Sequence, residues 1–168
     1  SSVPGNAISS ELKLQRLMMH RLIDFDRILI CRKTSIITQN DMSGIECDWN
    51  GVTCQKGVVV NISWSEEEYR IFPAWCPPTV VVIHFENQRI LNSVNTSVLP
   101  RDLEDLQMRV CGITGEIDLT RLPWKLKRCD LQRNKISGTV SLLHLPDTLE
   151  TLNLNGNTVT VYGMDGCL

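Results

Sequence analysis

The sequence predicts an α/β-type repeat solenoid, in which short parallel strands form one curved sheet and irregular turns form the convex side. Three observations predict this fold. A Leu-Pro dipeptide recurs every 23 residues, apolar residues recur at fixed places within that period, and an apolar helical pattern precedes the periodic part of the chain. A unit that buries its apolar residues against neighbouring copies of itself is typical of solenoid proteins.

The period of 23 residues defines four repeats. Three Leu-Pro dipeptides stand one period apart, and a Cys-Pro dipeptide stands one period before them: Cys76-Pro77, Leu99-Pro100, Leu122-Pro123 and Leu145-Pro146. The predicted repeats have the following bounds: 76–98, 99–121, 122–144 and 145–168.

Each repeat contains the pattern of a short, half-buried strand. Apolar residues occupy its eighth position, as Ile83, Leu106, Cys129 and Leu152, and its tenth, as Phe85, Met108, Leu131 and Leu154. This period-two alternation directs both positions to the core. The thirteenth position holds Gln88, Cys111, Asn134 and Asn157, where the chain leaves the strand and its backbone groups need side-chain partners.

At these positions the sequence resembles the leucine-rich-repeat (LRR) family. The signature LxxLxLxxN is visible from Leu126 to Asn134, with Cys129 in place of one leucine, and from Leu149 to Asn157. The longer pattern Leu-Pro-x-x-Leu, followed by Asn-x-Ile-x-Gly, is similar to extracellular LRR proteins of plants and flagellate protozoa. The resemblance implies a parallel sheet on the concave face of the solenoid.

A cap of residues 1–75 is expected before the repeats. Its motif Cys47-x-Trp49-x-Gly51-Val52-x-Cys54 resembles the N-terminal cap of plant-type LRR ectodomains. Residues 58–64 are expected to form the first strand, with Val60 and Ile62 at the eighth and tenth positions of the 23-residue frame. The sheet then has about five parallel strands. Residues 65–75 do not fit the repeat and are predicted to form an irregular loop.

Residues 9–30 are predicted to form an amphipathic helix within this cap. Apolar residues recur there at helical spacing, namely Leu14, Met18, Leu22, Phe25 and Leu29. Such a helix can cover the edge of the first strand, which otherwise presents unpaired backbone groups.

Two cysteines of the cap motif indicate the compartment. The resemblance implies a disulfide between Cys47 and Cys54, which places the protein in an oxidising environment. Two reduced thiols in a cytosolic protein are the alternative. The spacing does not fit a metal site, because neither a CxxC pair nor a histidine pair accompanies it.

The other five cysteines divide into core residues and a candidate pair. Cys111 and Cys129 occupy core positions and are predicted to be free, buried thiols. Cys31 and Cys76 form a candidate disulfide that would connect the helix region to the first repeat, and Cys167 then remains unpaired.

Composition and motifs exclude several classes of function. The net charge of −2 is spread along the chain without the basic stripe that binds nucleic acid. No apolar stretch reaches the roughly 20 residues that span a membrane. The three histidines, His20, His84 and His144, have no accompanying catalytic motif, and no phosphate-binding loop or cofactor motif is present. We therefore expect a protein that is not an enzyme and needs no cofactor.

The predicted concave surface is the candidate binding site. Its residues are the outward seventh, ninth and eleventh positions of the repeats: Val82, His84, Glu86, Asp105, Gln107, Arg109, Arg128, Asp130, Gln132, Thr151, Asn153 and Asn155. They are mixed in charge and suit a protein, peptide or glycan ligand. A solvated face with cross-strand pairs, such as Asp105 with Arg128, is the alternative interpretation.

Two sequons permit N-glycosylation in a secreted chain, Asn61-Ile62-Ser63 and Asn95-Thr96-Ser97. Asn95 lies on the return segment away from the sheet and is the preferred carrier. Asn61 projects from the concave face in this interpretation, where a glycan would obstruct binding.

The last repeat has no recognisable C-terminal cap, so its apolar edge needs a cover. Either the natural protein continues past Leu168, or a second copy stacks head to tail and builds a filament. Cys167 could seal such a contact, and Trp64, Trp75 and Trp124 are candidate contact residues.

These patterns together predict a secreted or cell-surface recognition domain. The alternatives are a self-assembling extracellular structural protein and an intracellular LRR scaffold subunit with reduced cysteines. Free-thiol counting separates the intracellular alternative from the extracellular ones.

Overall fold

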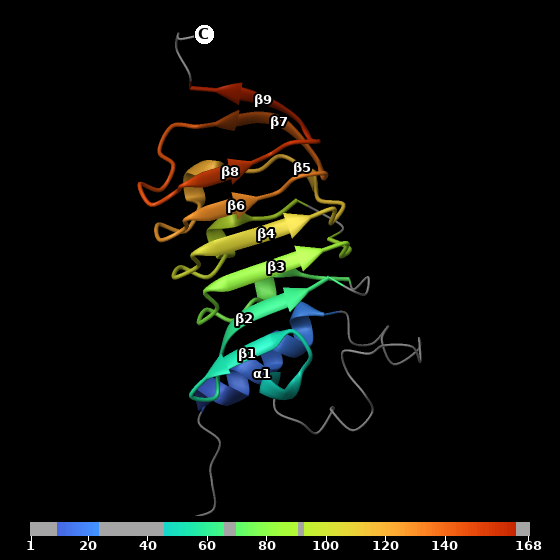
Figure 1. Ribbon diagram of the computed structural model, residues 1–168, viewed down its shortest axis with the longest axis vertical. Coiled ribbons are helices and arrows are strands. Elements are labelled where there is room, and N and C mark those ends of the chain that lie inside the picture. The colour runs from blue at the N-terminus through green and yellow to red at the C-terminus, as the bar shows by residue number, and fades with distance from the viewer. Residues whose placement is uncertain (1–9, 24–45, 66–69, 91–92, 164–168) are drawn as a thin grey trace, which may run out of the picture.

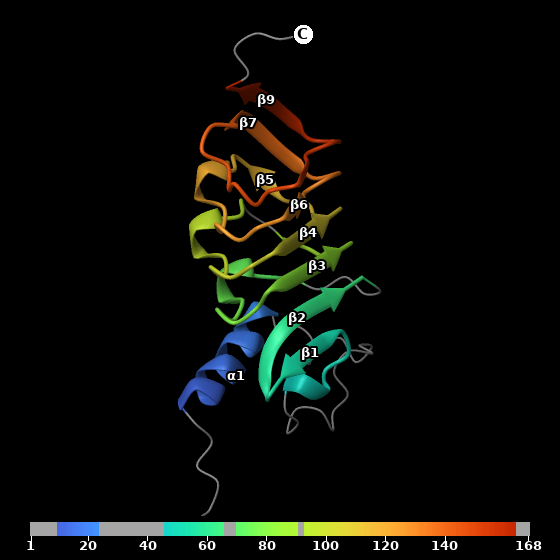
Figure 2. The ribbon, with the colours of Figure 1, turned by 60° about the vertical axis from the view of Figure 1, so that its left-hand side comes forward.

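The computed structural model describes residues 10–23, 46–65, 70–90 and 93–163. They form one elongated solenoid with a helix at its N-terminal end, as Figures 1 and 2 show. Its helix and strands have the following bounds: α1 Ser10–Leu22, β1 Val52–Gln55, β2 Val58–Trp64, β3 Val82–Glu86, β4 Asp105–Arg109, β5 Thr114–Gly115, β6 Arg128–Asp130, β7 Lys135–Ser141, β8 Thr151–Asn153 and β9 Thr158–Tyr162. Four 3-10 turns connect them: Glu46–Asp48, Pro73–Trp75, Thr96–Val98 and Leu119–Arg121.

The main sheet confirms the predicted parallel arrangement. Its strand order is β1-β2-β3-β4-β6-β8, and the five strands from β2 onward pair in parallel. From β3 onward the register follows the 23-residue period, because Val82 aligns with Asp105, Arg128 and Thr151 in turn. The repeat pattern therefore determines which side chains are neighbours across the sheet.

The cap strand lies two residues away from its predicted register. Ile62 aligns with Ile83, and Trp64 aligns with Phe85, so these two residues hold the eighth and tenth positions in place of Val60 and Ile62. Trp64 is 2% exposed and stacks on Phe85 with ring centroids 5.4 Å apart. The prediction that Trp64 is an assembly contact is wrong for this reason.

An unpredicted antiparallel strand, β1, completes the cap side of the sheet. It pairs with β2 through a two-residue turn at Lys56 and Gly57, which have φ of 52° and 80°. Positive φ at both central residues matches the twist of a tight hairpin. The predicted disulfide between Cys47 and Cys54 is confirmed, with Cα atoms 5.5 Å apart, and it ties β1 to the turn before it.

A second, three-stranded parallel sheet, β5-β7-β9, lies where the sequence predicts turns. Strands β7 and β9 are rich in threonine, valine and serine, residues that favour extended backbone. Each follows a thirteenth-position asparagine that bonds the backbone at the corner. The repeats from the second onward therefore carry strands on two faces.

Helix α1 is confirmed, but a different face of it is buried. Its buried residues include Gln15 and Met19, whereas Leu14 is 54% exposed. The Gln15 amide causes this rotation: its Nε2 donates to Gly57 O (3.3 Å), and its Oε1 accepts from Val59 N (2.9 Å). The predicted helix continues to residue 30, but Ile23 already forms a β-bridge with Ile71, and Phe25 and Leu29 lie outside the described residues.

His20 couples the stability of this cap to pH. Its ring meets Trp49 edge-on at 5.5 Å, and burial lowers its pKa below the ordinary value, with Glu46 opposing that shift. The unfolded chain then binds the proton more readily, so we expect stability to fall as pH drops below about 6.5. Urea unfolding at pH 7.5 and pH 5.5 measures this loss, and His20→Gln should reduce it. If His20→Gln loses as much stability between pH 7.5 and pH 5.5 as the wild type does, groups other than His20 cause the loss.

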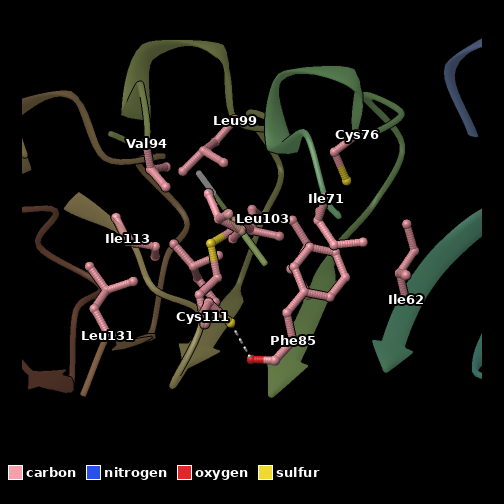
Figure 3. Close-up of a cluster of buried hydrophobic side chains, with 14 of the residues drawn as sticks. Ile62, Ile71, Cys76, Phe85, Val94, Leu99, Leu103, Cys111, Ile113 and Leu131 are labelled. Atoms are coloured by element: carbon pink, nitrogen blue, oxygen red, sulfur yellow. Dashed lines mark hydrogen bonds between the residues drawn. The ribbon is translucent and has the colours of Figure 1, made fainter. Parts of the chain in front are cut away.

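The core fills the space between the two sheets. Figure 3 shows side chains from successive repeats packed in layers, among them Phe85, Leu103, Ile113 and Leu131. Each of these four is at most 1% exposed. The Cys111 Sγ lies 3.2 Å from the carbonyl oxygen of Arg109 and 3.4 Å from that of Phe85, so its single S–H can donate to either one at the thirteenth position of this repeat.

Asn134 holds the corner after β6. Its Oδ1 accepts from the amides of Cys111 (3.0 Å) and Ile113 (3.2 Å), and its Nδ2 donates to the carbonyls of Met108 (2.7 Å) and Leu131 (2.8 Å). It is 7% exposed. One side chain therefore satisfies four backbone groups that water cannot reach, as the thirteenth position was predicted to do.

The candidate disulfide between Cys31 and Cys76 is wrong. Cys76 is a free, buried thiol, and Cys31 lies outside the described residues, as does Cys167. Cys111 and Cys129 are free and buried as predicted.

We expect the three buried thiols to resist modification in the folded protein. Burial raises the pKa of Cys76, and it raises that of Cys111 to about 11 and that of Cys129 to about 12. Because the thiolate is the reactive form, alkylation with iodoacetamide should reach these residues only after unfolding. Mass mapping of alkylated peptides before and after denaturation tests this, and rapid labelling of Cys129 in the native protein would contradict it.

Candidate functional site

The twelve predicted outward residues follow one face of the main sheet, and we call them the concave surface. Strand register aligns one row as Val82, Asp105, Arg128 and Thr151, and a second as His84, Gln107, Asp130 and Asn153. Glu86 aligns with Arg109 in a third row. Gln132 and Asn155 follow the ends of β6 and β8. The sequence frame therefore brings side chains from four strands onto one surface.

Polar side chains on this surface form a cross-strand network. His84 Nε2 lies 3.3 Å from Asp105 Oδ2 and 3.0 Å from Gln107 Nε2. Gln107 Nε2 donates to Asp105 Oδ1 (3.1 Å), and its Oε1 accepts from Arg109 Nη2 (2.6 Å). Because Gln107 is only 8% exposed, both ends of its amide are fixed by neighbours rather than by solvent.

Arg109 carries the network to the next strand. Its Nε lies 3.3 Å from Asp130 Oδ2, and Asp130 Oδ1 accepts from the backbone N–H of Gln132 (3.1 Å). The predicted ion pair of Asp105 with Arg128 is corrected by this arrangement: the two are aligned in register, but Asp105 interacts with His84 and Gln107. Arg128 is exposed and points its charge toward solvent.

A pocket of about 170 Å³ opens beside this network at the carboxyl ends of β2, β3 and β4. Its lining residues are Ser63, Trp64, Ser65, His84, Phe85, Glu86, Gln107 and Arg109. Ser63, Trp64 and Ser65 come from the cap, and the sequence frame did not predict them as site residues. The two-residue shift in the register of β2 is what brings them beside His84.

The pocket offers hydrogen-bond donors, acceptors and charges of both signs. Glu86 is exposed at its rim, while Arg109 and His84 are partly exposed. This chemistry suits a polar chain with both charges better than an extended apolar ligand. Within the described residues, no group of three or more His, Cys, Asp or Glu side chains is placed to hold a metal ion.

The two sequon asparagines differ in their surroundings. Asn95 is exposed at the start of the turn Thr96–Val98, where its Oδ1 accepts from Ser97 N (3.1 Å) and Ser97 Oγ (2.7 Å). Asn61 is half-buried on β2 between β1 and β3, and its Oδ1 has no hydrogen-bond partner among the residues that the structure describes. Access for an attached glycan is therefore much greater at Asn95.

Two other tryptophans lie outside the concave surface. Trp75 is 38% exposed with Arg21 over its ring, and Trp124 is 64% exposed beside Lys125. Both rings already have a cationic neighbour. No helix in the described part of the chain is both long and apolar enough to cross a membrane.

Solved structures of plant leucine-rich-repeat receptors share this fold. A chain of the BIR3–SERK2 complex from Arabidopsis thaliana superposes with a TM-score of 0.66 at 18% sequence identity, covering 88% of this chain and 82% of that chain. Pollen receptor kinase 3 superposes with a TM-score of 0.58 at 20% identity, covering 88% of this chain and 72% of that chain. No protein-family model and no curated protein sequence matches the chain. The likeness shows the fold, and the chain is a leucine-rich-repeat solenoid.

Proposed function

We propose that this chain is a non-catalytic recognition domain that binds a protein through its concave surface. The observation that carries the proposal is the partly buried network from His84 to Asp130, which fixes polar side chains of three strands beside an open pocket. Side chains held by neighbours lose little conformational entropy when a ligand binds. One of the similar solved structures is itself a complex of two proteins, BIR3 and SERK2, which supports a protein partner for this fold.

The concave surface favours a partner that carries both charges. Glu86 and Arg109 face each other across β3 and β4 at the pocket rim, and Arg128 lies exposed on the neighbouring strand. A polypeptide supplies a carboxylate and a cation at matching spacing along its length. A neutral glycan would offer no counterpart to the exposed charges of Glu86 and Arg128, so we favour a protein or peptide over a glycan.

We also propose that the domain works outside the cell. The Cys47–Cys54 disulfide supports this location, because such bonds persist in oxidising compartments. The exposed sequon at Asn95 adds support, since a glycan there would stand away from the concave surface. An intact mass of natively isolated protein should show one disulfide and added hexose at Asn95. Reduced Cys47 and Cys54 without a glycan would instead support the intracellular scaffold alternative.

Binding of the tagged domain to the surface of cells from its source organism tests the proposed site. We expect Glu86→Arg to lower the apparent affinity by about tenfold, which corresponds to about 1.4 kcal/mol. Glu116→Arg is the matched control, because it makes the same charge change at an exposed residue beside Gly138 of the second sheet. An equal loss in both variants would indicate a general charge effect and contradict the concave site.

A further inference from the structure

We propose that Val110 is the apolar anchor of the recognition surface, and that the partner presents a short segment with a basic, an apolar and an acidic side chain in that order. The segment crosses the ends of β3, β4 and β6, which Figure 1 shows on one side of the sheet. We call the residues that follow these strands, 87–89, 110–112 and 133–135, the carboxyl rim. This inference rests on the proposed function, because it assigns further contacts of the same surface.

The backbone at the twelfth position of every repeat is left-handed. The residues at this position have φ of 57°, 54°, 54° and 76° and are, in order, Asn87, Val110, Arg133 and Gly156. Hydrogen bonds of the corner hold Val110 in this conformation, because its N–H donates to Gln132 O (3.2 Å) and the next amide, of Cys111, donates to Asn134 Oδ1 (3.0 Å). The solenoid therefore requires a positive φ from whichever residue stands there.

Valine is the least suited of these four residues to a left-handed backbone. Glycine has no Cβ to clash, asparagine enters this region readily, and the unbranched arginine is less crowded than a β-branched side chain. The preceding repeat has Asn87 at the same position. Valine at position 110 therefore strains the fold relative to asparagine.

Core packing does not offset this strain. Val110 is 40% exposed and does not belong to the buried cluster between the two sheets. It lies in the interior of the solenoid, because Asn87 N donates to Arg109 O (3.1 Å) on one side and Val110 N donates to Gln132 O on the other. What the valine adds is an apolar side chain at the surface. Strained residues of this kind cluster at binding sites, where a ligand uses the side chain.

The surface beside Val110 is open and basic. Gly112 has a φ of 68°, and no atom lies within 4 Å of the place that a Cβ would take there. Arg89 and Lys135 hold the same position as Gly112 in the neighbouring repeats, and both are exposed. Arg133 is exposed on the strand side next to Val110, and neither Arg133 nor Lys135 forms an ion pair among the described residues. A carboxylate of the partner complements this side of the rim.

The order of the partner's groups follows from the order of the strands. Exposed Glu86 ends β3, Val110 follows β4, and Arg133 follows β6. Adjacent strands lie about 4.8 Å apart, so the acidic and basic ends of this row are separated by about 10 Å. Three residues of extended chain span about the same distance. A basic side chain for Glu86, an apolar one for Val110 and an acidic one for Arg133 therefore fit within about four residues of one polypeptide.

Val110→Asn tests the anchor, because it should change stability and binding in opposite directions. We expect the melting temperature of the unliganded chain to rise by about 2–4 °C as the strain is relieved. The apparent affinity of the tagged domain for cells of its source organism should fall about tenfold. His144→Asn is the matched control, because His144 is also exposed with a positive φ, of 62°, but lies outside the carboxyl rim. This control should leave binding unchanged.

Two results of this experiment overturn the inference. If Glu86→Arg loses binding while Val110→Asn binds like the wild type, Val110 is not an anchor, although the proposed function stands. If the melting temperature of Val110→Asn falls, the valine is covered by this chain itself. When neither Glu86→Arg nor Val110→Asn loses binding, the proposed function fails together with the inference.

Selection from a random peptide library on the purified chain tests the chemistry of the partner. We expect the wild-type chain to enrich peptides with a basic, an apolar and an acidic residue within about four positions, and Arg133→Glu to lose the preference for the acidic one. Arg101→Glu is the matched control, because Arg101 is exposed before β4, at the opposite end of the strands. No enrichment, a consensus without the acidic residue, or equal losses in the two variants overturns the inference.

Discussion

Replacement of Asn134 with alanine is expected to lower the free energy of unfolding by about 3–5 kcal/mol. The Asn134 amide bonds four backbone groups at the corner after β6, and the residue is 7% exposed. An alanine leaves these groups buried without partners, and each buried unsatisfied group costs about 1–3 kcal/mol. The loss exceeds that of an ordinary hydrogen bond because four groups depend on one side chain.

Urea unfolding monitored by circular dichroism measures this effect, with Asn157→Ala as the matched control. Asn157 holds the same repeat position, and it bonds Ile136 N, Leu131 O and Leu154 O, but it is half-buried. Water can replace part of its bonding there, so we expect a smaller loss. If the two variants lose equal stability, burial is not what makes Asn134 important.

Phe85→Ala is expected to lower the free energy of unfolding by a similar amount, about 3–5 kcal/mol. Phe85 is 1% exposed, stacks on Trp64 at 5.4 Å, and lies among the core residues drawn in Figure 3. Removal of the ring leaves a cavity between the cap strand and the first repeat.

His84→Ala is the control for Phe85→Ala, because it removes a ring from the neighbouring position on the opposite face of β3. Its side chain is 36% exposed, so its loss leaves no buried cavity, and we expect a change of less than about 1 kcal/mol. Thermal unfolding of both variants gives the comparison. Equal losses would show that the core packing of Phe85 adds little to the stability of the cap junction.

Much of the solenoid could be predicted from the sequence because one period sets both the burial and the register of its strands. Leu106, Cys129 and Leu152 share one repeat position, and they align across β4, β6 and β8 as that position requires. The period also located Asn134 at the corner that it holds. These features depend on local pattern alone, so the sequence contains all the information they need.

The cap was predicted less well because its contacts are particular to it. The first strand does not follow the 23-residue spacing. The frame therefore assigned Ile62 to the tenth position, whereas it holds the eighth, and it put Trp64 outside the core, whereas Trp64 holds the tenth. A buried amide, Gln15, turned α1 away from its most apolar face. The Lys56-Gly57 pair between two apolar runs was a readable hairpin signal for β1.

The candidate site likewise contains some residues that the 23-residue period predicts and others that it does not predict. The outward positions of β3, β4 and β6 follow from the period, whereas Ser63 and Ser65 reach the pocket only through the shifted register of the cap strand. The pairing of Asp105 with His84 rather than with Arg128 depends on side-chain conformation. Strand spacing alone allows either partner.

Site-specific photocrosslinking tests the central claim, that the concave surface binds a protein, most directly. A benzophenone amino acid replaces Arg128, which is exposed on β6 of the concave surface, or Thr139, which is exposed on β7 of the second sheet. The domain is then irradiated on cells of its source organism. We predict one discrete protein adduct from position 128 and none from position 139. No adduct from either position, or the same adducts from both, would contradict recognition through the concave surface.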